Sequence, residues 1–384
     1  MNKNIRRSIA ALCAAVTVAM PLSSAPAFSG ISSNTVSAEA ASYCFLSGST
    51  NYEFNYTDKK ENYRLYFDVL DSSAKTAAVI GCCTYHTGTN ITIPLTAKFR
   101  GVEYRITEID DGAFARQKNI RYVNITENVK KIGDSAFRDC SEIGCVYWND
   151  TLTDIGDRAF MNCSGIKSPY AFNFYNVKTV GEYAFKNCTG IHSIWFKKLS
   201  SLGEGAFENC YALKEVLLSS PYLTEIPDYA FRNAGSTVED GAYVISSSVT
   251  KIGDQAFYKV GNIKEIDISG VSYIGDSAFE DCHRLEKAVT GDNLHHIGDR
   301  AFYGNDYMKY FVFAPRYGYI GEEALGFDHM KHYTGPKKDF TIYVLTGKHG
   351  GLRTNDALFY AIANDIDFDD IDNAPAGYYK GIYE

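Results

Sequence analysis

A six-residue phrase that recurs along most of the chain constrains the fold more than any other feature. Ile-Gly-Asp-x-Ala-Phe stands intact at five places, which end at Phe137, Phe160, Phe257, Phe279 and Phe302. Variants of the phrase end at positions 114, 185, 207, 231 and 325. Successive copies are 22 to 26 residues apart. A period of that length is typical of solenoids in which each repeat forms one coil, so the chain is predicted to fold as a stack of coils.

Each repeat also contains apolar residues at the spacing of a β-strand. Ile120, Val123 and Ile125 form one such triplet. The period of two predicts a strand that buries alternate side chains. Within the phrase, we expect Ile and Phe to fill the core and Gly to provide a turn with unusual dihedral angles. Asp is expected to cap a short helical turn. Because no single coil can bury its own apolar face, stacking has to supply the core.

Five copies of the phrase carry a cysteine three residues after Phe: Cys140, Cys163, Cys188, Cys210 and Cys282. The resulting Ile-Gly-Asp-x-Ala-Phe-x-x-Cys pattern resembles the BspA-like leucine-rich repeats of bacterial secreted and surface proteins, over residues 88 to 345. The resemblance implies an α/β repeat solenoid, a right-handed leucine-rich-repeat superhelix. Its parallel β-sheet would form the concave face, and short helical or 3-10 turns the convex face. The resemblance also implies secretion and the binding of a partner, including host or matrix proteins.

The repeat cysteines allow two interpretations. They could link the coils through a ladder of disulfides or metal ligands, or they could be small buried thiols. Ala234 and Val260 occupy the same place in other copies, which favours buried thiols. Without Cys13 of the leader the chain has nine cysteines, an odd number that excludes a complete disulfide framework. A disulfide from Cys44 to Cys82 or Cys83 is left open.

The N-terminus reads as an export signal. Lys3, Arg6 and Arg7 precede an apolar run from Ile9 to Met20, which is too short to span a bilayer. We assign residues 1–41 to a signal peptide and processed leader, with cleavage after Ala27 or near residues 38–40. We then expect an N-terminal β cap at 42–105, leucine-rich repeats at 106–340, a C-terminal cap at 341–373 and a flexible tail at 374–384. No second apolar run is long enough to span a membrane.

Charge and motifs exclude several classes of function. The formal net charge of −8 disfavours nucleic acid and anionic lipid as partners, because both require clustered Lys and Arg. No Gly-x-Ser-x-Gly, His-Glu-x-x-His or Walker motif occurs, so we predict no enzyme and no catalytic residue. Cys83 and His86 offer only two metal ligands. We therefore predict no metal and no cofactor.

The candidate binding residues lie at outward positions of the predicted strands. They are Tyr122, Asn124, Tyr147, Tyr170, Trp195 and Leu217. In coils about 4.8 Å apart these side chains would form one stripe. Later coils place Asp267, Val289 and Val312 there. The stripe has two interpretations: Tyr and Trp simply suit strands, or they form a binding patch.

The leading hypothesis is a secreted or cell-surface interaction and adhesion protein that binds a macromolecular partner through its concave face. An extracellular protein from the host, the matrix or a cell surface is the first candidate, since extended solenoid faces suit large partners. The alternative is a carbohydrate-binding module of an extracellular polysaccharide system, because Tyr and Trp also stack on sugar rings.

Overall fold

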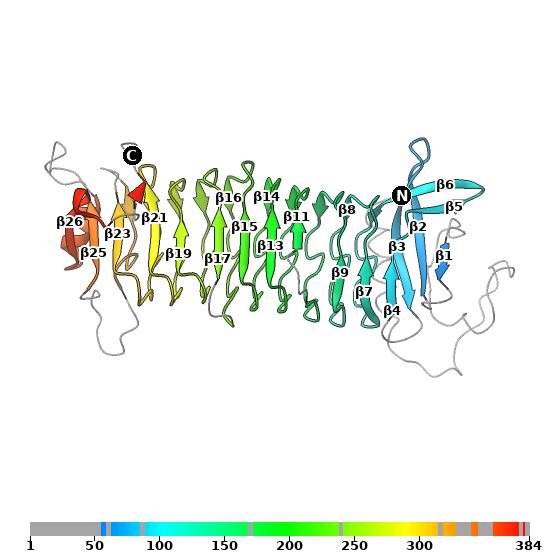
Figure 1. Ribbon diagram of the computed structural model, residues 1–384, viewed down its shortest axis with the longest axis horizontal. Coiled ribbons are helices and arrows are strands. Elements are labelled where there is room, and N and C mark those ends of the chain that lie inside the picture. Colours follow the sequence, from blue (N-terminus) through cyan, green and yellow to red (C-terminus); the bar gives the residue numbers. More distant parts are fainter. Residues whose placement is uncertain are drawn as a thin grey trace.

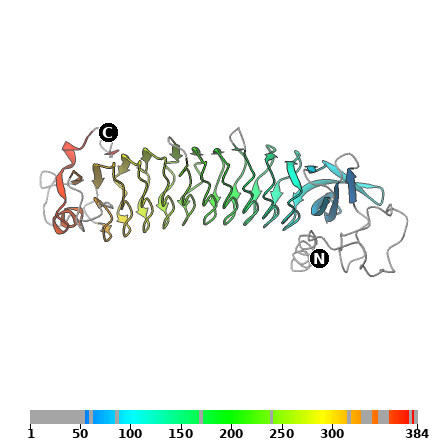
Figure 2. The ribbon, with the colours of Figure 1, turned by 90° about the horizontal axis from the view of Figure 1, so that it is seen from below.

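The computed structural model describes residues 55–58, 63–84, 89–167, 172–237, 241–313, 318–327, 339–344, 356–375 and 379–380. The expected signal peptide lies outside them. Within these ranges, no helix has the length and apolar character that a membrane crossing requires. The described residues form parallel β-coils stacked along the longest axis of the molecule (Figures 1 and 2).

The first elements form a β-rich N-terminal region at one end of the stack. They are β1 (Asn55–Asp58), β2 (Tyr63–Asp71), β3 (Thr76–Thr84), β4 (Thr89–Thr92), β5 (Thr96–Phe99) and β6 (Val102–Ile109). β1, β2 and β3 pair antiparallel, and so do β5 and β6. β3 pairs with β6 in parallel, and β6 pairs in parallel with the first short strand of the solenoid. This region therefore continues directly into the coils.

The longer strands of successive coils lie side by side and form one face of the stack, here called the strand face (Figure 1). After β4 it contains β7 (Ile120–Asn124), β9 (Cys145–Tyr147), β11 (Phe172–Phe174), β13 (Ser193–Phe196), β15 (Glu215–Leu218), β17 (Ala242–Ile245), β19 (Glu265–Asp267), β21 (Lys287–Gly291), β23 (Tyr310–Phe313) and β25 (Thr341–Val344). Its hydrogen bonding is interrupted after β9, after β17 and after β21. The strand face is thus a series of short parallel sheets.

A second row of short parallel strands runs along another side of the coils. It contains β8 (Lys131–Ile132), β10 (Asp154–Ile155), β12 (Thr179–Val180), β14 (Ser201–Leu202), β16 (Glu225–Ile226), β18 (Lys251–Ile252), β20 (Tyr273–Ile274), β22 (His296–Ile297) and β24 (Tyr319–Ile320). The Ile of the repeated phrase ends most of these strands. Ile132, Ile155 and Ile252 are all buried.

A column of stacked phenylalanine rings, one from each coil between Phe114 and Phe302, runs through the core. Centroids of successive rings are 4.7 Å apart between Phe114 and Phe137 and 5.0 Å apart between Phe279 and Phe302. The strand triplet Ile120, Val123 and Ile125 is buried as well. The predicted inward positions are therefore confirmed, and stacking supplies the core because each ring covers its neighbours.

The Gly-Asp pair has a different role from the one expected. Gly133 does not adopt a positive φ; a Cβ there would come 2.6 Å from the backbone nitrogen of Asp111 in the preceding coil. Asp134 in turn accepts a hydrogen bond at Oδ1 from the backbone N–H of Asp157 in the next coil, at 3.1 Å. Gly is thus required by the close approach of two coils, and Asp links coils.

The repeated phrase continues into turns, and the helices of the described chain lie in the C-terminal region. The expected α/β coil with helical or 3-10 turns is therefore replaced by a β-coil. Two residues in each turn adopt the left-handed region, for example Ser135 (φ 55°) and Asp139 (φ 64°). In the following coils the second position is Asn162, Asn187, Asn209 and Asn233, whose amides donate in sequence to the preceding coil. Asn and Asp tolerate this backbone conformation, which accounts for their presence.

The C-terminal region closes the other end of the stack. It contains α2 (Asp356–Ala363), β26 (Asp367–Asp370), η2 (Ile371–Asn373) and β27 (Tyr379–Lys380). β26 extends the β23–β25 sheet. β27 lies in the segment for which the sequence predicts a flexible tail, and it pairs in parallel with residues Thr290 and Gly291 of β21.

Candidate functional site

The predicted stripe divides into two groups on separate sheets. Tyr122 and Asn124 on β7 and Tyr147 on β9 belong to the sheet of β4, β7 and β9. Trp195 on β13 and Leu217 on β15 are paired in the next sheet along the strand face. A break in the strand ladder after β9 lies between the two groups. That they form one binding surface stays a prediction.

Tyr170 lies outside the described residues. The strand register places Asn173, on β11, beside Trp195, where the sequence had placed Tyr170. The reason is the length of this repeat. The copies of the phrase that end at Phe160 and Phe185 are 25 residues apart, so more residues separate Phe160 from the next strand than in the shorter repeats.

The stripe also does not continue as an exposed surface toward the C-terminus. Asp267 is exposed, but Val289 and Val312 are buried, with 8% and 0% of their surface exposed. Val312 pairs with Tyr343 of β25, which is buried too. Val289 and Val312 are therefore unavailable to a partner.

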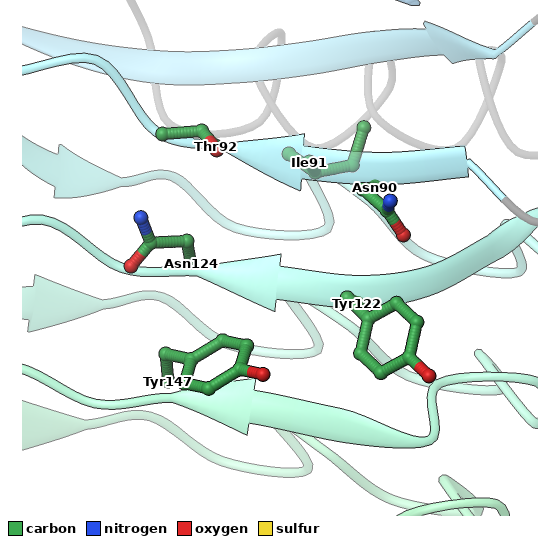
Figure 3. A pocket seen from close by; sticks show the side chains of 6 residues that line it. All are labelled: Asn90, Ile91, Thr92, Tyr122, Asn124 and Tyr147. Carbon is green, nitrogen blue, oxygen red and sulfur yellow. The ribbon is translucent and has the colours of Figure 1, made fainter. Parts of the chain in front are cut away.

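The first group lines an open depression of about 480 Å³ in the strand face, next to the N-terminal region (Figure 3). Its residues are Asn90, Ile91, Thr92, Tyr122, Asn124 and Tyr147. The register aligns Asn90 with Tyr122, and Thr92 with Asn124 and Tyr147, across three strands. The two tyrosine rings come from neighbouring strands, and their side chains are 39% and 58% exposed.

The sequence analysis missed the contribution of β4, because it assigned that segment to the cap alone. The alternation of Asn90, Ile91 and Thr92 carried the signal: Ile91 is buried, whereas Asn90 and Thr92 are exposed beside the tyrosines. β4 is thus the first strand of the strand face.

The outer edge of β4 is closed by a side chain from β2. The Tyr63 hydroxyl accepts a hydrogen bond from the Thr92 N–H and donates one to the Thr92 carbonyl, both at 3.1 Å. These are the backbone groups that an added strand would pair with. Tyr63 therefore holds the depression in place and blocks this part of the edge.

The second group forms an apolar row of Trp195, Leu217 and Val244. They occupy one register position on β13, β15 and β17. Trp195 and Leu217 are half-buried, and Val244 is 49% exposed. The sequence analysis missed Val244, since it lies between two other apolar residues and the alternation gives no indication of which faces solvent.

The repeat cysteines lie in the interior. All five are buried free thiols: Cys140, Cys163, Cys188, Cys210 and Cys282. Each donates a hydrogen bond to the backbone carbonyl of the repeat phenylalanine in the preceding coil, for example Cys163 to Phe137 at 3.0 Å. Cys145 is the exception, partly exposed on β9 beside Tyr147. Cys44 lies outside the described residues. In the described coils and caps, no three His, Cys, Asp or Glu side chains are arranged to hold a metal ion.

Comparison with known structures gives several similar proteins. The pneumococcal vaccine antigen PcpA is 16% identical over 82% of this chain and 98% of its own, with a TM-score of 0.44. A leucine-rich repeat protein of T. pallidum is 18% identical over 70% of this chain and 98% of its own, with a TM-score of 0.36. A leucine-rich cell surface protein of Faecalibacterium prausnitzii is 18% identical over 68% and 88%, with a TM-score of 0.32.

No curated protein matches the chain. The model of the BspA type leucine-rich repeat region matches residues 107–238 and 224–344, with six copies. The match covers more than half of the sequence, and it indicates no catalytic family. The chain therefore belongs to the BspA type leucine-rich repeat proteins.

Proposed function

We propose that this protein is exported and acts outside the cell as an interaction and adhesion protein that binds another protein through its strand face. The apolar row of Trp195, Leu217 and Val244 carries the proposal. These side chains stand beside one another on three parallel strands and remain partly open to solvent. Adjacent exposed apolar side chains on a soluble protein mark contact surfaces, and tryptophan is enriched among the residues that dominate binding energy.

The surroundings of the row suit a protein interface. Asn173 flanks Trp195 on the preceding strand, and Glu215 lies beside Leu217 on β15. Lys197 comes directly after β13, and its Nζ lies 4.4 Å from the centroid of the Tyr175 ring. An apolar centre within a polar rim is the usual organisation of such interfaces.

Export is proposed from the leader at residues 1–41, with its basic start and short apolar run. N-terminal sequencing of protein collected from the medium or the cell surface tests this step. We expect a start between residues 28 and 42, and retention of Met1 in exported protein would contradict it.

The binding experiment is a pull-down with the mature chain, residues 42–384, against host, matrix and cell-surface proteins. The test variant is Trp195→Ala with Leu217→Ala, and the control is Tyr319→Ala. Tyr319 is an exposed aromatic residue (52%) on the second row of strands, away from the strand face. We expect the double variant to lose the captured protein and the control to keep it, with both folded by circular dichroism. Equal capture by the folded double variant, or no captured protein at all, would reject the proposal.

A further inference from the structure

The depression differs in chemistry from the apolar row. None of its six lining residues is charged. Its solvent-facing groups are two phenol rings, two carboxamides and one hydroxyl, from Tyr122, Tyr147, Asn90, Asn124 and Thr92. A ligand with net charge would meet no opposite charge among these groups. The lining is therefore complementary to an uncharged molecule that has both apolar and hydrogen-bonding surfaces.

The carboxamides of the depression are not used by the fold. Asn162, Asn187 and Asn209 each bond to the preceding coil through their side chains. Asn90 and Asn124 are exposed and make no side-chain hydrogen bond to the described part of the chain. Each amide retains two donors and an acceptor for a ligand.

We propose that the depression binds one uncharged pyranose ring of an extracellular glycan. A pyranose has an apolar face of C–H groups, which packs on the electron-rich face of a tyrosine ring. Its hydroxyls both donate and accept, as the amides and Thr92 do. The volume of about 480 Å³ lies within the range of small-molecule sites. The rings of Tyr122 and Tyr147 and the amide of Asn124 line the same depression (Figure 3).

A peptide strand suits this site less well. Extended peptides add to a sheet through its free edge, and here Tyr63 occupies the N–H and carbonyl of Thr92. The depression also offers no cation or anion for a charged side chain. Since it lies on a different sheet from the apolar row, glycan binding and protein binding are separately testable.

The experiment is isothermal titration of the mature chain with xylotriose, cellotriose, mannotriose and a galactose trisaccharide, and with trigalacturonate as the charged counterpart. We expect at least one neutral trisaccharide to bind. Tyr147→Ala and Asn124→Ala should each weaken that binding by about tenfold, through loss of a ring contact or of amide hydrogen bonds. Tyr222→Ala, which removes a ring that is 63% exposed outside the depression, should leave the dissociation constant unchanged.

A second readout uses the unmodified protein and needs no variant. The partly exposed Cys145 thiol lies beside Tyr147, so a bound sugar should slow its alkylation by iodoacetamide several-fold. Saturating trigalacturonate should not slow it. The proposal is overturned if no neutral trisaccharide binds, if folded Tyr147→Ala binds the trisaccharide as tightly as the native chain does, or if the charged trisaccharide binds and protects equally well. Loss of protein capture by the Trp195 and Leu217 variant would not affect these outcomes.

Discussion

Gly156 lies directly against the backbone of Asp134 in the preceding coil. A Cβ at Gly156 would come 2.6 Å from Asp134 Oδ1 and 2.7 Å from its backbone nitrogen. The Gly-Asp pair that marks the sequence repeat is therefore a contact between coils.

This contact predicts the effect of adding one methyl group. Gly156→Ala forces neighbouring coils apart, and we expect a loss of about 2 kcal/mol in the free energy of unfolding. Gly144→Ala is the control, since a Cβ there would lie 3.7 Å from the nearest atom, the Arg121 carbonyl oxygen. Urea denaturation measures both variants. Equal stability of the two would show that the coils are not closely packed at Gly156.

The asparagine ladder predicts an unusual ranking of substitutions at Asn187. Asn187→Ala removes hydrogen bonds to Asn162 and Asn209 and places alanine at a φ of 63°. We expect a loss of about 3 kcal/mol, from two hydrogen bonds and the strained backbone. Asn187→Gly loses the same bonds without the strain, so it should be more stable than Asn187→Ala by about 1 kcal/mol. The opposite order in thermal denaturation would contradict the left-handed backbone.

The buried thiols predict that stability falls at alkaline pH. Burial raises the pKa of Cys140 to about 12, from the ordinary value of 9.0 for a cysteine thiol. Above pH 9 the unfolded chain loses this proton and the folded chain keeps it, so the free energy of unfolding falls until the pH approaches 12. Each such thiol contributes a slope of about 1.4 kcal/mol per pH unit.

Urea denaturation between pH 7 and 10.5 measures this slope. Burial also raises the pKa of Cys163, Cys188 and Cys210, so the native protein should have a steep dependence. Cys140→Ala should be less steep than the native protein over the same interval. Identical slopes would mean that the Cys140 thiol ionises in the folded state.

The Tyr63 hydroxyl predicts a local effect at the depression. Tyr63→Phe leaves the Thr92 N–H and carbonyl without their partner, and we expect a loss of about 1 kcal/mol. Hydrogen exchange should show faster exchange of the Thr92 amide. Tyr122→Phe removes an exposed hydroxyl from the same region and serves as the control, with a change within about 0.5 kcal/mol. Unchanged exchange in Tyr63→Phe would show that this edge is protected by something else.

Much of the fold follows from the sequence alone, because period and alternation are local properties. The 22- to 26-residue period gives the stack of coils, and the triplet of Ile120, Val123 and Ile125 gives the buried side of a strand. The cysteine position, shared with Ala234 and Val260, indicates a small buried side chain. Each of these patterns needs only the chemistry of a few residues.

The tertiary structure decided whatever depends on contact between different coils. The need for Gly156 comes from Asp134, 22 positions earlier, and no dihedral preference at Gly156 reveals it. The pairing of Asn173 with Trp195 follows from a strand register that the longer repeat shifts. Asn90 and Thr92 complete the depression only because β4 docks beside β7. Such contacts are fixed by packing between segments distant in the chain, so no local pattern encodes them.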